Sequence, residues 1–116
     1  MWEIEFYESP TKECPTEEFL RSLHKKDELP YVMREIDLLK EFGNKLHRPH
    51  ADYLENGIYE LRIRVQNKQF RLLYFYFFQE KIIISHGIRK EAKVKNSEIK
   101  KAISHKNDYL SRHERR

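Results

Sequence analysis

The stretch of residues 57–90 constrains the fold most, because its pattern predicts three consecutive β-strands. Apolar and polar side chains alternate over residues 59–66, which is typical of a strand with one buried face. Residues 70–78 are apolar on both faces except for Arg71, as expected of a central strand. Residues 81–88 are rich in β-branched side chains, which favour a third strand. We therefore expect an antiparallel meander at the centre of the molecule.

The first connection in this meander sets which residues face each other. If Asn67-Lys68 is a two-residue loop, Val65 opposes Phe70 and Arg64 opposes Arg71. Like charges directly opposite on a sheet are destabilising. Solvation of an outer face would accommodate Arg64. Arg71, in an apolar central strand, instead requires an anionic partner or a wet cleft.

The second connection adds a histidine to the same face. With Gln79-Glu80 as a two-residue loop, His86 opposes Leu73. Neither loop contains Gly, so both assignments rest on spacing alone. One face of the sheet is then predicted to carry a positively charged site formed by Arg62, Arg64, Arg71 and His86.

One further strand and three helices are predicted around the meander, which gives an α+β fold. The strand covers residues 2–7, and two helices follow, over residues 15–26 and from residue 29 or 30 to residue 42. Residues 45–56 form a polar connection with room for a short strand or bulge, and the last helix begins with Asn96 or Ser97 as its N-cap.

The helices are expected to cover the sheet unevenly. The first two should cover the face that carries Tyr59, Leu61, Leu72 and Tyr74. The last helix should cover the apolar half of the opposite face, around Phe75, Phe77, Ile82 and Ile84. The cationic half of that face then stays open, and we expect a binding site there.

Length and cysteine content narrow the class of protein. We expect residues 1–116 to form one domain with its own core. The longest apolar run, residues 72–78, is too short to span a bilayer. The single cysteine, Cys14, excludes an internal disulfide and fits a reducing cytosol. A cytoplasmic protein without a membrane segment is therefore predicted.

Charge is distributed unevenly along the chain. Residues 1–56 contain 8 Lys and Arg against 13 Asp and Glu, whereas residues 81–116 contain 11 against 4. A basic carboxy-terminal third is typical of proteins that bind nucleic acid or another polyanion. A plain solvated surface would also account for it.

The histidines do not predict a metal site. His47 and His50 lie three residues apart, and His86 follows on the meander. No Cys, Asp or Glu spacing completes a recognisable zinc pattern around them. We expect neither a metal nor a cofactor.

Several motifs, in this order, resemble the RelE/ParE toxin superfamily. They are an amino-terminal strand with a helical hairpin, then LENGIYELRI, FRLLYFY and ISHGIRKEAKVKNSEIKKA. The nearest branch is that of the HigB-like toxins. The resemblance implies the RelE-like fold and a type II toxin–antitoxin mRNA interferase, which enters the ribosomal A site and cuts mRNA. It also implies a cognate antitoxin, of the HigA-like kind with a helix-turn-helix domain, through which the complex binds operator DNA.

The family's functional positions map onto particular residues of this chain. The Arg of the Glu-Leu-Arg motif is Arg62, and the Arg at the head of the central strand is Arg71. The basic segment after the last strand corresponds to Arg89 and Lys90. Departures from the family pattern are found at Glu91, Lys95 and Asn96. Because Lys95 replaces the tyrosine of RelE, the proton-transfer scheme of RelE does not transfer intact.

RNA cleavage without metal uses the ribose 2′-OH as nucleophile, and the enzyme must stabilise the developing charge and move two protons. Arginines suit the first task, so Arg62 and Arg71 are the expected phosphate ligands, with Arg89 and Lys90 as further clamps. His86 is a candidate acid or base and equally a candidate core residue. Contacts to the RNA backbone are expected from Arg64, Lys93, Lys95, Lys100 and Lys101.

Two other functions stay open at this point. A ParE-like toxin would poison DNA gyrase by protein contact and would cleave nothing, and it would have no need of a phosphate-binding Arg71. A basic module could instead bind RNA or protein without chemistry. The carboxylates Glu60 and Glu91 are weaker candidates for the acid or base, and we expect them to be ion-pair partners of the arginines.

Overall fold

The computed structural model describes residues 1–89 and 93–113 and confirms the predicted α+β class. The strands are β1 (Glu3–Phe6), β2 (Ala51–Glu55), β3 (Ile58–Val65), β4 (Lys68–Phe77) and β5 (Lys81–Arg89). The helices are α1 (Pro15–Arg21), α2 (Leu29–Phe42), the short 3-10 helix η1 (Gly43–Lys45) and α3 (Asn96–His113). In the part of the chain that is described, no helix is long and apolar enough to cross a bilayer.

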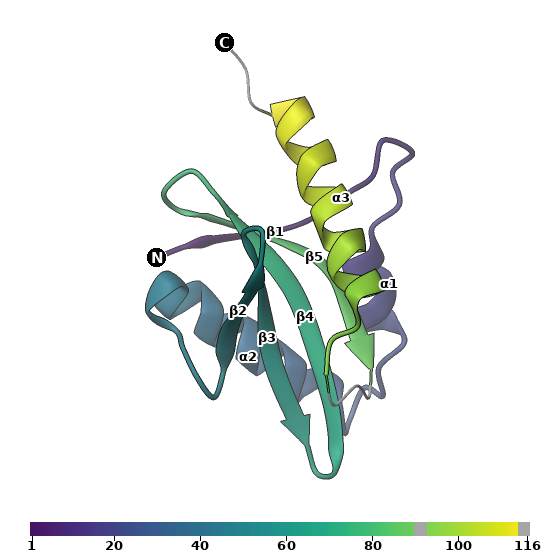
Figure 1. Ribbon diagram of the computed structural model, residues 1–116. Helices are drawn as coiled ribbons and strands as arrows, with labels where there is room; N and C mark the ends of the chain where they lie inside the picture. Colours follow the sequence, from purple (N-terminus) through teal and green to yellow (C-terminus); the bar gives the residue numbers. More distant parts are fainter. Residues whose placement is uncertain (90–92, 114–116) are drawn as a thin grey trace.

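The five strands form one sheet in the order β1-β5-β4-β3-β2, which confirms β4 as the central strand. β1 runs parallel to β5, and the other neighbouring strands are antiparallel. The polar connection before β3 contains β2, which forms the edge of the sheet. Figure 1 shows α1 and α2 on one face of the sheet and α3 on the other.

The first helix is shorter than the sequence predicts. α1 ends at Arg21, where the Ser22 hydroxyl donates to the carbonyl oxygen of Phe19 at 2.6 Å. Beyond this turn, a carboxylate oxygen of Glu28 accepts the backbone N–H of His24 at 2.8 Å. These bonds hold the chain in a tight connection, so the helical period stops before the two lysines that follow.

Two apolar layers hold the helices on the sheet. On one face, α2 supplies Val32, Ile36 and Leu39 against sheet residues that include Leu61, Leu72 and Tyr74. On the other face, α3 supplies Ile99, Ala102 and Tyr109 against Leu73, Phe75 and Phe77. The predicted cover of each face by its helices is thus confirmed for β3 and β4.

The β3–β4 loop differs from the prediction. It consists of Gln66-Asn67, and Arg71 therefore lies opposite Arg62 and not opposite Arg64. Gln66 takes a φ of 58°, the left-handed conformation that a tight two-residue loop needs. Because side chains alternate with a period of two, the shifted register leaves all three arginines on the predicted face.

The β4–β5 loop is longer than predicted. It contains residues 78–80, so the first half of β5 is displaced by one position against β4. The displacement turns Ile82 and Ile84 toward the layer formed by α1 and α2. The prediction that α3 covers these two residues is therefore wrong. Ile83 packs against α3 in their place.

A β-bulge at Ser85 reverses this displacement. The register changes between the pairs Tyr74–Ile84 and Leu73–His86, so Ser85 is the extra residue on β5. Beyond the bulge, His86 lies opposite Leu73 as predicted. Because of the bulge, the consecutive residues Ser85 and His86 both face α3. The bulge thus cancels the displacement introduced by the longer loop, and His86 lies on the predicted face.

Candidate functional site

Arg62 and Arg71 face each other across β3 and β4, and Glu60 joins them. One oxygen of Glu60 accepts from Arg71 Nε at 2.9 Å, and the other accepts from Arg62 Nε at 2.9 Å. The side chain of Glu60 is 6% exposed, that of Arg71 9% and that of Arg62 36%. The buried carboxylate offsets the repulsion of two opposed cations, and it is the anionic partner that Arg71 requires.

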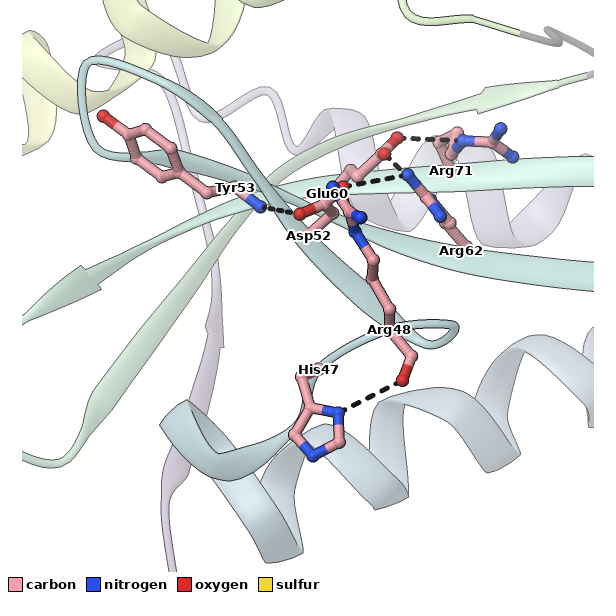
Figure 2. Close-up of polar contacts among 7 residues, drawn as sticks. All are labelled: His47, Arg48, Asp52, Tyr53, Glu60, Arg62 and Arg71. Carbon is pink, nitrogen blue, oxygen red and sulfur yellow. Dashed lines mark hydrogen bonds and ion pairs between the residues drawn. The ribbon is translucent and has the colours of Figure 1, made fainter.

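The charges continue to alternate beyond Arg62. Asp52 on β2 accepts from Arg62 Nη2 at 3.1 Å and from Arg48 Nε at 3.0 Å. Burial opposes ionisation of Asp52, but the hydrogen bonds from Arg48 and the Tyr53 amide lower the pKa of Asp52 below its ordinary value. Figure 2 shows these side chains from Arg48 to Arg71. Three guanidinium groups thus alternate with two carboxylates across the sheet.

Two surface hollows share the arginines Arg62 and Arg71 of this ion-pair chain. The first, of about 670 Å³, is lined by Arg62, Arg64, Arg71, Gln69, Glu35 and His50, together with Pro49 and Ile63. The second, of about 350 Å³, is lined by Arg62, Arg71, Lys93 and Asn96 among others. The two arginines therefore form a wall that both hollows share. Guanidinium groups fixed in this way suit the binding of phosphate oxygens.

His86 is placed elsewhere. Its side chain is 3% exposed, and its Nε2 contacts a carboxylate oxygen of Glu98 on α3 at 2.9 Å. Its Nδ1 lies 2.8 Å from the Ser85 hydroxyl, which also contacts His105. Burial, with the nearby charge of Lys101, lowers the pKa of His86 to about 4. His86 lines neither hollow and joins α3 to the sheet.

Arg89 is also separated from Arg71. It lies opposite Phe70, so its side chain is on the face of α1 and α2. There, its Nη2 donates to Glu28 at 3.1 Å and to the carbonyl oxygen of Ser22 at 3.2 Å. Lys90 and Glu91, the other residues predicted in this segment, lie outside the described residues.

The predicted RNA-binding residues are distributed around the hollows. Arg64 is exposed and lines the first hollow, and Lys93 is exposed and lines the second. Lys95 is exposed just before α3, and Lys100 and Lys101 are exposed on its first half. In residues 1–89 and 93–113, no group of three His, Cys, Asp or Glu side chains is arranged to hold a metal ion.

Sequence reasoning missed three contributors to the site. Asp52 and Arg48 extend the ion-pair chain, and Glu35 enters the first hollow from α2. Asp52 could have been found if the polar connection had been assigned a strand, because its pairing with Glu60 then follows from the register. No local signal connects Glu35 with the sheet.

Comparison with known protein families identifies a match over most of the chain. Residues 18–107 match the model of a family described as phage derived protein Gp49-like (DUF891). This range includes the second half of α1, all of α2, the whole meander and most of α3. No curated protein matches the chain.

Proposed function

We propose a function from the premise that this chain belongs to the phage-derived Gp49-like family, a toxin-like family related to RelE and HigB and associated with toxin–antitoxin systems. The chain acts as the toxin of a type II system, of the HigB-like branch. It is an endoribonuclease that cleaves mRNA in the ribosomal A site without a metal, and it thereby inhibits translation and growth.

The shared wall formed by Arg62 and Arg71 is the observation that carries this proposal. Glu60 fixes the two guanidinium groups beside both hollows before any substrate binds. Charge that develops on a phosphate in the transition state is best stabilised by donors that need no reorganisation. Exposed Arg64 and Lys93 extend the positive surface along the hollows, where they can contact neighbouring phosphates.

The proposed reaction is an intramolecular transfer. The 2′-oxygen attacks the adjacent phosphorus, the bond from phosphorus to the 5′-oxygen breaks, and the products are a 2′,3′-cyclic phosphate and a 5′-hydroxyl. Ribosome-bound mRNA presents this nucleophile close to the phosphate, so the toxin's task is to orient the backbone and stabilise charge. Arg62 and Arg71 bind the phosphate oxygens in this scheme.

An antitoxin is the proposed partner at rest. A HigA-like protein with a helix-turn-helix domain would cover the cationic hollows and bind operator DNA for the complex. Positive potential at the site favours association with an acidic segment and makes the association rate sensitive to salt. The ribosome and its mRNA are the proposed partners of the released toxin in the cytoplasm.

Cleavage of a programmed message tests the function. Ribosomes with an empty A site would receive either an all-ribose message or one with a single 2′-deoxy residue at the cleavage position, and primer extension would map the products. We expect the ribose message to be cut and the deoxy message to survive, because the deoxy residue lacks the nucleophile.

Other outcomes would point to the alternatives. Equal cleavage of both messages would eliminate the 2′-OH mechanism. An intact ribose message together with gyrase-dependent DNA breaks would favour the ParE-like function. Binding of RNA or protein without any cleavage would leave a non-catalytic module.

A further inference from the structure

The first hollow contains a histidine–carboxylate pair beside the arginines. His50, just before β2, contacts Glu35 on α2, with Nδ1 at 3.1 Å from a carboxylate oxygen. The His50 side chain is 42% exposed and that of Glu35 is 17% exposed. Both line the hollow that also contains Arg62, Arg64 and Arg71. A solvent-accessible imidazole thus lies in the same hollow as the proposed phosphate ligands.

The backbone fixes His50 next to the arginine wall. The amide of Arg62 donates to the carbonyl oxygen of His50 at 2.7 Å, and the amide of His50 donates to the carbonyl oxygen of His47 at 2.9 Å. His50 is therefore tied at its own main chain to the strand that carries Arg62. This placement meets the first requirement for a proton-transfer group, a defined position near the reacting atoms.

The contact with Glu35 selects which ring nitrogen is basic. An ionised carboxylate can only accept hydrogen bonds, so the proton of the neutral imidazole is on Nδ1. The lone pair is then on Nε2, in the arrangement by which a carboxylate orients a histidine base in serine hydrolases. His86 has no comparable access, because its ring is 3% exposed and held between Ser85 and Glu98.

We infer that His50 is the general base of the cleavage reaction and that Glu35 is its positioning residue, an assignment that rests on the proposed function. His50 Nε2 takes the proton of the ribose 2′-OH as the 2′-oxygen forms its bond to phosphorus. The bond from phosphorus to the 5′-oxygen breaks, and the departing oxygen takes a proton from solvent water in the open hollow. The imidazolium then returns its proton to solvent, and no oxidant, reductant or metal enters the balance.

Single-turnover cleavage on programmed ribosomes tests this assignment. The His50→Ala protein should cleave about 10²–10⁴-fold more slowly than wild type, as is typical when a general base is removed. Added imidazole should restore much of the rate, because the hollow is open and the missing group is small. His47→Ala is the matched control, since His47 is an exposed neighbour that does not line the hollow, and it should cleave at the wild-type rate.

Glu35→Gln separates positioning from structure. The variant should lower the rate at saturating ribosomes and leave the half-saturating concentration unchanged, because Glu35 acts through His50. Thermal unfolding of each variant would establish that it is folded.

Two results would overturn the inference while the proposed function stands. One is a His50→Ala rate within about threefold of wild type. The other is a loss that imidazole does not restore in a folded variant that binds ribosomes normally. Failure of the wild-type protein to cut any message would overturn the proposed function itself, and the inference with it.

Discussion

Glu28 and Glu60 each hold two cationic side chains, and they do so on opposite faces of the sheet. Glu28 accepts from Lys68 at 2.8 Å and from Arg89 at 3.1 Å, and its side chain is 5% exposed. Glu60 accepts at 2.9 Å from both of its partners, and its side chain is 6% exposed. The two carboxylates are nearly equivalent in burial and in the distances to their partners.

Their surroundings differ. Glu28 also accepts the amide of His24, and so ties the connection between α1 and α2 to the ends of β4 and β5. The His24 amide, Lys68 and Arg89 outweigh the effect of burial and lower the pKa of Glu28 to about 2. Glu28 lines neither hollow, whereas Glu60 holds two arginines in the wall between them. A bridged pair of cations is therefore a candidate site only where the cations also border open space.

The largest expected effect is on cleavage activity, which should depend on the Glu60 cluster and not on the Glu28 cluster. Arg62→Ala should lower single-turnover cleavage on ribosomes by about 10²–10³-fold, because it removes a fixed donor to the developing charge. Arg89→Ala should stay within about threefold of wild type, because its side chain is on the opposite face. A comparable loss in both variants would show that Arg89 is a phosphate clamp, as the sequence alone predicts.

A second prediction concerns stability and pH. The pKa of Glu28 is about 2 in the folded protein against an ordinary value of 4.5, so its stabilising contribution is complete above about pH 4.5 and is lost as the pH falls toward 2. That shift corresponds to about 3 kcal/mol of the free energy of unfolding. Glu28→Gln should therefore be less stable than wild type by about that amount at pH 7 and by less than half of it at pH 3.

Urea unfolding at the two pH values measures this difference. The control is ribosomal cleavage by the variant in the absence of urea, where the protein is folded. The folded Glu28→Gln protein should keep its activity, because Glu28, Lys68 and Arg89 line neither hollow. A stability difference that persists unchanged at pH 3 would contradict the ionic explanation.

The smallest effect divides the Glu28 cluster itself. Lys68→Met keeps most of the aliphatic stem and removes the charge, and the Lys68 side chain is 41% exposed. We expect a loss of only about 0.5–1 kcal/mol in the free energy of unfolding, as for half-exposed ion pairs. A loss as large as that of Glu28→Gln would mean that Lys68, and not the His24 amide or Arg89, dominates the cluster.

Much of the fold follows from periodicity. The alternation in β3, the doubly apolar β4 and the apolar stripes of α2 and α3 each depend on one element and its burial, and the structure confirms them. Loop lengths are harder to predict, because neither hairpin loop contains the Gly that would identify its turn type. The wrong prediction that Ile82 and Ile84 pack against α3 is a direct result of the uncertain loop length.

The site was predictable only in part, for a similar reason. The alternation of side chains along β3 and β4, with an antiparallel pairing, is enough to place Arg62, Arg64 and Arg71 on one face. Asp52 reaches these arginines because β2 pairs with β3, and Glu35 reaches the first hollow because α2 packs on the sheet. Neither contact can be read from spacing along the sequence. Arg89 follows its strand onto the other face, where Glu28 holds it.

The bulge at Ser85 gives the two ends of β5 different registers against β4. The three-residue loop shifts the register of β5 against β4 by one residue, and the bulge shifts it back by one residue. Between the loop and the bulge the strand contains Ile82, Ile83 and Ile84. Because all three are apolar, this run can pack in either register, with either set of side chains facing α3. A loop shorter by one residue would therefore leave the segment from His86 onward in its orientation against α3 only if the bulge were lost with it.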